Sequence, residues 1–270
     1  MRAIAMSLCS FLAILMIVTA TASDEATLHA FKAQVSHGSS LASWNCSTGL
    51  CSWEGVTCSH RRPMRVVALR LNSTGLVGAL PPVIGNLTFL RKLDLSFNLL
   101  HGDIPASLGH LRRLKRLYLY DNSFSGPVPV NLSWCTSMII MGLSNNKLGG
   151  HIPAELGEKL MSLEVRNNSF TGPIPASLEN LSHLQILDLS QNQLMGSIPP
   201  GLGSNQSMQY FDLFGNNFSG MLPPSLYNWS SLEVLNVGGN MFYGSIPGDI
   251  GSKFPKLEYL NHSPTVILRG

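Results

Sequence analysis

LRKLDLSFNLLHGDIPASLGHLRR, residues 90–113, is the stretch that decides the fold, because most of the chain repeats it. Counted from Leu90, apolar residues stand at positions 1, 4 and 6, and Asn98, Gly102 and Pro105 follow at positions 9, 13 and 16. The apolar alternation predicts one short strand, and the later residues predict a turn and an irregular return. A unit this short cannot bury its own apolar face, so it must stack on its copies.

The same frame fits eight units and a ninth, degraded unit that starts at Leu257. Position 13 is Gly and position 16 is Pro in all eight, and position 9 is Asn in all but the first, where Thr74 stands. Columns held in register over so many units identify a repeat protein. The units are 24 residues apart, except for one spacing of 22, and start at Val66, Leu90, Leu114, Met138, Leu160, Leu184, Met208 and Leu232.

Each column has a physical reason. Side chains at positions 4 and 6 point to the same side of a strand and are buried, while positions 5, 7 and 8 lie on the open face. The turn after position 8 buries backbone N–H and C=O groups, which an Asn amide can satisfy because it both donates and accepts. Gly permits a conformation that other residues resist, and Pro fixes an extended return. We therefore expect an α/β repeat solenoid with one core and a parallel sheet along one side.

The beginning of the chain does not follow the repeat. Residues 1–22 contain one basic residue, Arg2, an apolar run and small residues before Ser23, which is typical of a cleaved signal peptide. The run is shorter than the roughly 20 apolar residues that span a bilayer. Residues 23–64 place apolar residues such as Leu28 and Phe31 at helical spacing, and tryptophans and cysteines follow. Because a solenoid needs its first apolar layer covered, we expect an N-terminal cap here.

The predicted domain organisation has four segments. These are a signal peptide at 1–22, the cap at 23–64, eight repeats at 65–256 and a degenerate, truncated repeat at 257–270. In the last segment His262 stands where the frame requires Leu, and Thr265 stands where it requires Asn. We therefore expect the chain to be a fragment or a truncated product of a longer protein.

The cysteines leave one choice open. Cys46, Cys51 and Cys58 all lie in the predicted cap, which allows one bridge and one leftover cysteine whose partner the sequence does not identify. Cys135 stands at a repeat position that other units fill with Leu or Trp, so we expect a buried hydrophobic residue rather than a reactive thiol. The histidines are scattered over different columns and predict no metal site, and nothing indicates a cofactor.

The formal net charge of +3 is too small to indicate nucleic acid or an anionic membrane as a partner. Ten Asn-x-Ser/Thr triplets occur, although a chain rich in these residues forms some of them by accident. Three share position 21, on the side away from the sheet, where sugars would leave the strands bare. The predicted glycosylation sites are Asn45, Asn86, Asn131, Asn180, Asn205 and Asn228.

The unit LxxLxLxxNxLxGxIPxxLGxLxx resembles the plant-type leucine-rich repeat. The segments DEATLHAFK, LASWN and CSWEGVTC resemble the amino-terminal cap of plant leucine-rich-repeat receptor kinases and receptor-like proteins. The resemblance implies a right-handed superhelix with a parallel sheet on the concave side, 3-10 helices on the convex side and a helical cap. It also implies that Cys51 pairs with Cys58.

The resemblance further implies an extracellular ectodomain that binds a peptide or pathogen-derived protein and then docks a leucine-rich-repeat co-receptor. Such a receptor enters the secretory pathway and is held at the plasma membrane, whereas a chain that ended here would be secreted. No Gly-rich phosphate loop, His-Arg-Asp loop or Asp-Phe-Gly motif is present, so we expect no enzyme activity. A secreted inhibitor of microbial cell-wall-degrading enzymes, built from the same repeats, is the alternative.

The candidate ligand-binding residues occupy the open face of the predicted sheet. Phe97, Tyr118 and Tyr120 come from adjacent units and should lie side by side, flanked by charged residues. A solvated face with ordinary scattered aromatic residues is an equally open alternative. Arg91, Lys92, Lys115 and Arg116 form a basic edge, which is more typical of solubility than of a binding site. The predicted ligand-binding set is Asp94, Phe97, Tyr118, Tyr120, Asp121, Arg166, Asp188 and Phe214.

Overall fold

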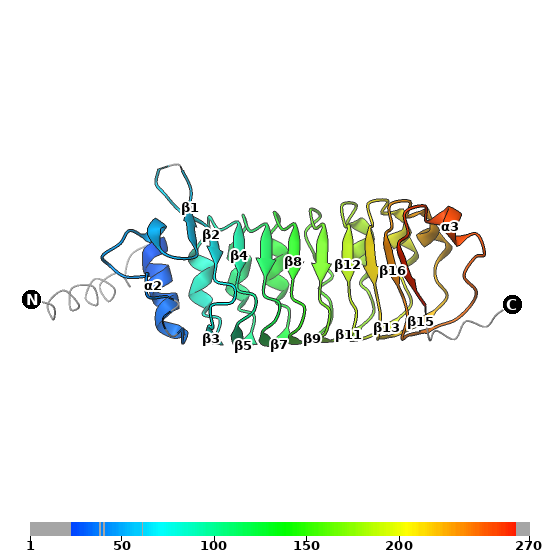
Figure 1. Cartoon of the computed structure of the whole chain (residues 1–270), viewed down its shortest axis with the longest axis horizontal. Helices are drawn as coiled ribbons and strands as arrows, with labels where there is room; N and C mark the ends of the chain where they lie inside the picture. Colours follow the sequence, from blue (N-terminus) through cyan, green and yellow to red (C-terminus); the bar gives the residue numbers. More distant parts are fainter. Residues whose placement is uncertain (1–22, 38, 40, 61, 263–270) are drawn as a thin grey trace, which may run out of the picture.

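The computed structural model describes residues 23–37, 39, 41–60 and 62–262. The predicted signal peptide at 1–22 and the end of the ninth unit lie outside this part of the chain. The described residues form an elongated solenoid in which the repeats stack side by side along the long axis (Figure 1). This is the predicted fold class, and one continuous hydrophobic core runs from Leu28 in the cap to Phe254 near the other end.

The first sheet contains the strand predicted at the start of each unit. Its neighbouring strands are parallel, except that β1 is antiparallel to β2. We call its outward surface, made by repeat positions 3, 5, 7 and 8, the strand face. The strands, in order, are β1 (Val56–Cys58), β2 (Val66–Arg70), β4 (Lys92–Asp94), β6 (Arg116–Tyr118), β8 (Ile140–Gly142), β10 (Ser162–Glu164), β12 (Ile186–Asp188), β14 (Tyr210–Asp212), β16 (Val234–Asn236) and β18 (Tyr259–Asn261).

A second parallel sheet follows the turn of each unit, where the sequence had predicted only an irregular return. Its strands cover repeat positions 10–14, and in β5 the exposed Leu99 and His101 alternate with the buried Leu100. This short alternation is the signal that the sequence analysis did not use. The strands are β3 (Val77–Ala79), β5 (Leu99–Asp103), β7 (Ser123–Pro127), β9 (Lys147–Gly150), β11 (Ser169–Gly172), β13 (Gln193–Gly196), β15 (Asn217–Gly220) and β17 (Met241–Phe242).

Short 3-10 helices form the side of the solenoid away from the strand face, as the resemblance implied. Each helix begins directly after the Pro at position 16 of its unit, because this Pro fixes the extended backbone of the residue that precedes the helix. The 22-residue unit that starts at Met138 has no such helix, so its missing residues fall on this side. The helices are η2 (Pro82–Asn86), η3 (Ala106–His110), η4 (Val130–Trp134), η5 (Ala176–Asn180), η6 (Pro200–Ser204) and η7 (Pro224–Asn228).

The asparagines at position 9 form the predicted column, which we call the asparagine ladder. In Asn122, Nδ2 donates to the carbonyl oxygens of Leu95 at 3.0 Å and Leu119 at 3.1 Å, and Oδ1 accepts the Leu100 N–H at 3.0 Å. Leu95 and Leu100 belong to the preceding unit, so each asparagine joins two units. The same three kinds of bond recur at Asn98, Asn146, Asn168, Asn192, Asn216 and Asn240.

The residue before each rung of the ladder adopts a left-handed backbone. Position 13 was predicted to need Gly, and the structure confirms this with a positive φ, for example 75° at Gly102. A left-handed backbone was not predicted at position 8, the residue before each asparagine of the ladder, yet φ is positive there as well. The position 8 residues are Ser73, Phe97, Asp121, Asn145, Asn167, Gln191, Gly215 and Gly239.

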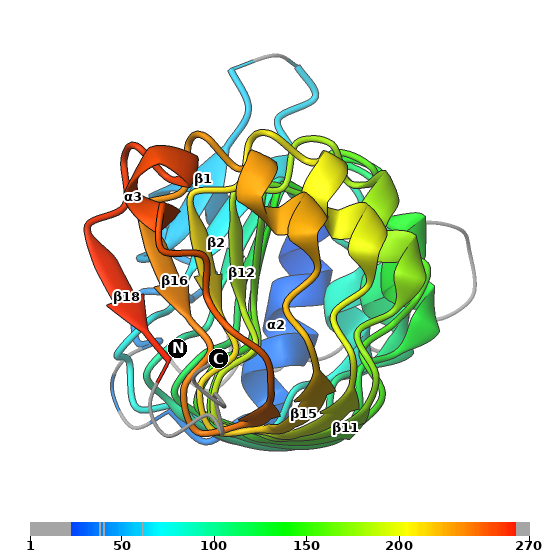
Figure 2. The same ribbon diagram turned by 90° about the vertical axis from the view of Figure 1, so that its right-hand side faces the viewer.

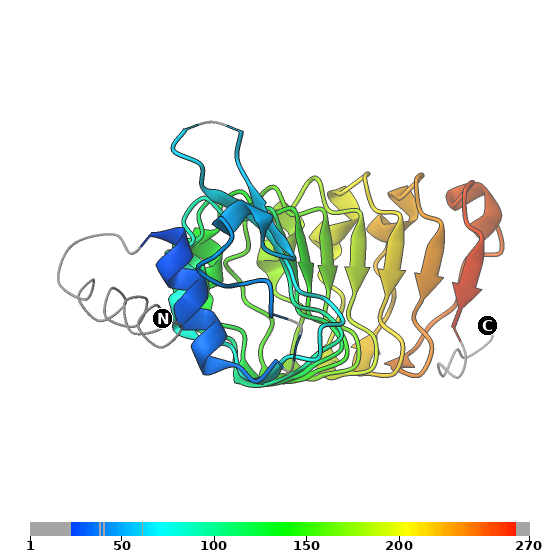
Figure 3. The same ribbon diagram turned by 60° about the vertical axis from the view of Figure 1, so that its left-hand side comes forward.

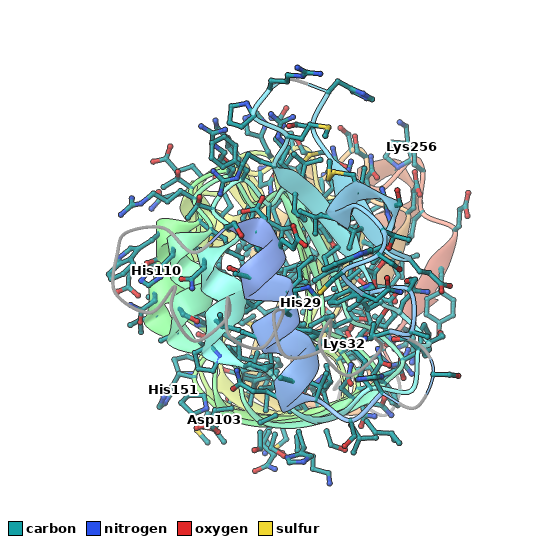
Figure 4. All side chains as sticks on the ribbon, turned by 90° about the vertical axis from the view of Figure 1, so that its left-hand side faces the viewer. His29, Lys32, Asp103, His110, His151 and Lys256 are labelled. Atoms are coloured by element: carbon teal, nitrogen blue, oxygen red, sulfur yellow. A yellow bond between two sulfur atoms is a disulfide. The ribbon has the colours of Figure 1, made fainter. Side chains whose placement is uncertain are left out.

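The N-terminal cap covers the first repeat with helix α2 (Asp24–Gln34), which lies against η2 (Figure 3). Ser23 caps the helix by accepting the Ala26 N–H at 3.2 Å. Lys32 fixes the following loop, because its Nζ donates to the carbonyl oxygens of Leu41 at 2.7 Å and Trp44 at 2.8 Å. Figure 4 shows Lys32 and His29 on α2 at this end of the molecule.

The cap has its own aromatic core and disulfide. The rings of Trp44 and Trp53 stack with their centroids 5.5 Å apart, and the short 3-10 helix η1 (Leu50–Ser52) lies between them in sequence. Cys51 is bonded to Cys58, which confirms the pairing implied by the resemblance. Cys46, left over in the sequence analysis, is not a free thiol.

Cys135 is buried in the core, as predicted. Its Sγ donates to the carbonyl oxygen of Leu108 at 3.3 Å, and burial raises the pKa of the thiol to about 11. The thiolate, which is the reactive form, is therefore scarce at neutral pH.

The opposite end consists of helix α3 (Ile250–Lys253) and the edge strand β18, seen end-on in Figure 2. Phe254 follows α3 and is buried, with its ring 5.7 Å from that of Tyr227. Met221, Phe242 and Tyr243 line an apolar hollow of about 400 Å³ at this end.

Candidate ligand-binding face

Three aromatic residues of the strand face meet on the units that contain β4 and β6, whereas Phe214 and Tyr259 lie further along the same face. Phe97 follows β4 at position 8, where the backbone φ is 54° and 53% of the residue is exposed. Its ring meets that of Tyr120 edge to face at 5.2 Å, and Tyr120 meets Tyr118 edge to face at 6.0 Å. We call Phe97, Tyr118 and Tyr120 the aromatic cluster. The structure therefore brings together the three residues that the repeat frame placed side by side.

Gly142 on β8 lies directly beside the aromatic cluster. It pairs with Tyr118 in the sheet, so a side chain at this position would stand against the rings. A Cβ built there would lie 3.4 Å from Cδ1 of both Tyr118 and Tyr120. Gly142 is itself buried, so the two tyrosine rings pack against its backbone.

Asp94 lies on the strand face but is not the exposed charge that the sequence predicted. Only 8% of Asp94 is exposed, its Oδ2 lies 3.1 Å from Lys92 Nζ, and its Oδ1 accepts from Ser96 Oγ at 2.7 Å. Lys92 Nζ lies 5.0 Å from the centre of the Tyr118 ring, so Asp94 holds this cation over the ring. Burial raises the pKa of Tyr118, which keeps its hydroxyl protonated and able to donate.

Asp121 stands beside the aromatic cluster, as predicted, but is partly engaged. Its Oδ1 accepts from Asn145 Nδ2 at 2.9 Å, and Asn145 Oδ1 accepts from Asn167 Nδ2 at 3.1 Å. These position 8 side chains form a polar chain along the end of the strands. Asp121 is only partly buried and keeps acceptor capacity for a ligand.

The remaining predicted residues lie further along the strand face. Arg166 follows β10, and its Nε donates to Gln191 Oε1 at 3.2 Å. Asp188 on β12 accepts from Ser190 Oγ at 2.6 Å and is buried, and burial raises its pKa although these hydrogen bonds oppose the rise. Phe214, after β14, is 36% exposed. These residues do not join the aromatic cluster but belong to a separate part of the same face.

That second part contains an acidic row which the sequence analysis did not single out as a set. Glu164, Asp188 and Asp212 pair across neighbouring strands in the sheet register. Asp212 Oδ2 accepts from Tyr210 Oη at 3.2 Å and from Asn236 Nδ2 at 3.0 Å. Burial and the carboxylates of the row raise the pKa of Tyr210. The strand face therefore has an aromatic half and an acidic half.

Five of the six predicted glycosylation sites are at least partly accessible, but Asn205 is not. Asn205 is 2% exposed, and its Nδ2 donates to the carbonyl oxygens of Leu181 at 3.1 Å and Leu184 at 2.7 Å. It replaces a core Leu of the repeat and uses its amide inside the solenoid. The folded structure therefore contradicts Asn205 as a glycan acceptor. Glycosylation of Asn45, Asn86, Asn131, Asn180 and Asn228 stays a prediction.

Neither a membrane-spanning helix nor a metal site occurs in the described residues. No helix there is long and apolar enough to cross a bilayer. No group of three or more His, Cys, Asp or Glu side chains in the same residues is arranged to hold a metal ion.

Comparison with known protein families identifies both the cap and the repeats. The family described as Leucine rich repeat N-terminal domain matches residues 21–59, and the Leucine rich repeat families match residues 89–111, 113–135, 158–218 and 231–252. The chain belongs to the leucine-rich-repeat family. The matched cap and repeats are those whose motifs first indicated the family.

The relatives of this leucine-rich-repeat chain include plant receptors. Receptor kinase-like protein Xa21 of Oryza sativa subsp. japonica is 51% identical over 84 residues, which are 28% of this chain and 8% of that protein. The match therefore spans less than a tenth of the relative. The ectodomain of GASSHO1/SCHENGEN3 from Arabidopsis thaliana, solved with CASPARIAN STRIP INTEGRITY FACTOR 2, is 36% identical with a TM-score of 0.81, covering 84% of this chain and 28% of that one.

A plant ice-binding protein has nearly the same leucine-rich-repeat fold. It is 29% identical with a TM-score of 0.82, and the similarity covers 91% of this chain and 79% of that one. The repeat frame is therefore shared by a receptor ectodomain and an ice-binding protein. What this chain binds must be argued from its own strand face.

Proposed function

We propose that this chain is the ligand-recognition part of a plant receptor and binds a peptide or protein on the strand face, anchored by the aromatic cluster. The observation that carries the proposal is the placement of Phe97. A bulky residue at a φ of 54° is unfavourable, and the same position holds a small or polar residue, Ser, Asp, Asn, Gln or Gly, in the other units. The strain is repaid if the exposed ring serves recognition.

The chemistry of the aromatic cluster suits a peptide. Tyrosine rings supply large contact areas at low conformational cost, and aromatic residues dominate the binding energy of protein interfaces. The exposed ring of Phe97 and the half-buried rings of Tyr118 and Tyr120 offer an apolar contact surface, while Lys92 and Asp121 supply charges beside it. Buried anchors ringed by polar groups are the usual arrangement at such sites.

The relatives support a receptor function for this chain. The GASSHO1/SCHENGEN3 ectodomain was solved with a second protein factor, and Xa21 is named as a receptor kinase-like protein. By this analogy we place the strand face of this chain outside the cell. Docking of a leucine-rich-repeat co-receptor after ligand binding belongs to the same proposal.

The test is selection of ligands from a phage-displayed library of random peptides, panned on the secreted chain. Peptides that are enriched should bind the Tyr118→Ala/Tyr120→Ala variant more weakly by about tenfold or more, since interface aromatic anchors contribute over about 1 kcal/mol. The matched control is Trp134→Ala/Tyr243→Ala, which removes two exposed aromatic residues away from the strand face. Enriched peptides that bind both variants as tightly as the unaltered chain would overturn the proposal that the aromatic cluster anchors the ligand.

A further inference from the structure

A second hollow lies at the edge of the strand face nearest the cap, beneath the connection between β1 and β2 that stands out from the solenoid in Figure 1. Its volume is about 740 Å³. We call it the arginine hollow. The lining residues that matter here are His60, Arg62, Arg65, Phe89, Arg91 and Arg113.

The repeat register builds the centre of the arginine hollow. Arg65, Phe89 and Arg113 precede position 1 in three successive units, so they stand in a row. The guanidinium carbon of Arg65 lies 4.3 Å from the centre of the Phe89 ring, and that of Arg113 lies 4.2 Å from it. Phe89 is therefore held between two cations, and both are fixed in place by cation–π contacts.

The charges in the hollow are not balanced. Arg65 has a partner, since its Nε and Nη2 lie 3.0 Å and 2.8 Å from the two carboxylate oxygens of Asp24. Arg62, Arg91 and Arg113 form no ion pair within the described residues. These three arginines are exposed, and their like charges around one hollow raise the local positive potential, which favours an anionic ligand there.

We propose that the arginine hollow binds an acidic peptide segment, with Arg91 and Arg113 as its principal contacts. Guanidinium groups match carboxylates with two parallel hydrogen bonds, and arginine clusters are a recurrent means of recognising acidic motifs. Val67 and Pro63 add apolar walls that suit the remaining atoms of a peptide. An acidic sugar polymer fits less well, because Phe89 is already occupied by Arg65 and Arg113 and offers no open aromatic face for a sugar ring.

The hollow is continuous with the aromatic half of the strand face. Arg91 and Lys92 are consecutive on the unit of β4, Arg116 lies in register with Lys92, and Tyr118 follows on β6. A peptide with an acidic segment in the hollow can therefore extend across this basic edge to the aromatic cluster. This extension rests on the proposed function, whereas binding in the hollow can be tested alone.

The test uses fluorescently labelled hexaglutamate and the chain of the sequence given, with fluorescence anisotropy as the measurement. The unaltered chain should bind, and Arg91→Gln/Arg113→Gln should weaken binding by about tenfold or more because two charge-assisted contacts are lost. The control Lys147→Gln/Lys159→Gln removes the same charge from exposed residues of another unit and should change little. Circular dichroism of each variant establishes that it is folded.

Salt and a competitor sharpen the result. Affinity should fall as salt shortens the screening length from about 10 Å at roughly 0.1 M to about 3 Å at roughly 1 M. No binding of hexaglutamate, or equal losses in the arginine and lysine variants, would overturn the proposal. Oligogalacturonate that competes more strongly than hexaglutamate would overturn the peptide assignment.

The Tyr118→Ala/Tyr120→Ala variant separates this proposal from the proposed function. It should bind hexaglutamate like the unaltered chain, because the arginine hollow does not include the aromatic cluster. A chain that binds hexaglutamate through Arg91 and Arg113 but enriches no library peptide would reject the aromatic anchor and keep the hollow. The reverse result would reject the hollow alone.

Discussion

The asparagine ladder and the strand face are neighbours in every unit, yet they respond to different demands. Position 9 is Asn in seven successive units because the backbone around it always needs the same two donated bonds and one accepted bond. Position 8, one residue earlier, holds Ser, Phe, Asp, Asn, Gln or Gly. The difference shows that the repeat restricts a residue where its side chain satisfies the backbone, as it does where a side chain fills the core. Where it faces outward, even an unfavourable residue is tolerated.

The largest expected effect is on the ladder. Asn122→Ala removes the bonds to the Leu95 and Leu119 carbonyl oxygens and the Leu100 N–H, all of which lie in the partly buried turn. Leaving such groups unpaired should lower the free energy of unfolding by about 3 kcal/mol or more, measured by urea denaturation. The control Asn72→Ala, at an exposed position of the strand face, should stay within about 0.5 kcal/mol. Similar losses of unfolding free energy in Asn122→Ala and Asn72→Ala would show that the ladder is no more important for stability than an exposed position of the strand face.

A smaller effect, of opposite sign, is expected at Asp188 in the acidic half of the strand face. Burial raises its pKa, so the folded state gains stability from the protonated form at low pH and loses it as pH rises through that raised pKa. Asp188→Asn keeps the acceptor for Ser190 and does not titrate. The variant should therefore be more stable than the unaltered chain at neutral pH.

The measurement for Asp188→Asn is thermal unfolding at a series of pH values. Its advantage over the unaltered chain should shrink as pH falls toward about 3, where the carboxyl group is protonated in both the folded and unfolded states. An advantage that is the same at every pH would show that the charge of Asp188 is not its cause.

The smallest effect on stability is expected at Phe97. Phe97→Gly relieves a left-handed backbone that costs a side-chain-bearing residue about 1–2 kcal/mol, but it loses the edge contact with Tyr120, worth about 0.5–1.5 kcal/mol. These terms nearly cancel, so the urea midpoint should hardly move, while binding of the selected library peptides should weaken. A loss of stability above about 1 kcal/mol would show that the ring is held for packing and not for recognition.

The sequence predicted those parts of the molecule whose physics repeats. The first sheet, the role of Asn122 and the meeting of Phe97 with Tyr120 follow from one frame, because the register between units is the same everywhere. The second sheet was missed because its alternation at Leu99, Leu100 and His101 is only a few residues long. The left-handed backbone at position 8 was missed because Phe97 and Gln191 obscure a signal that Asn145, Asn167, Gly215 and Gly239 do carry.

Contacts between residues far apart in the sequence could not be predicted from the repeat frame. Asp24 at the start of α2 holds Arg65, which is 41 residues away, and is buried between the cap and the first strand. The arginine hollow depends on the same contact. Asp94 was predicted to be an exposed charge, but its carboxylate forms an ion pair with Lys92 on the same strand. Composition and spacing do not show which charges are already paired.

The short unit that starts at Met138 has a consequence for how this molecule can vary. Its missing residues are taken from the helical side, while β8 remains paired with β6 and β10 in unbroken register. The helical side can therefore gain or lose residues without displacing any side chain of the strand face. In such a protein, point substitutions on the strand face can change ligand specificity, and deletions on the helical side can change the length of a unit, independently of each other.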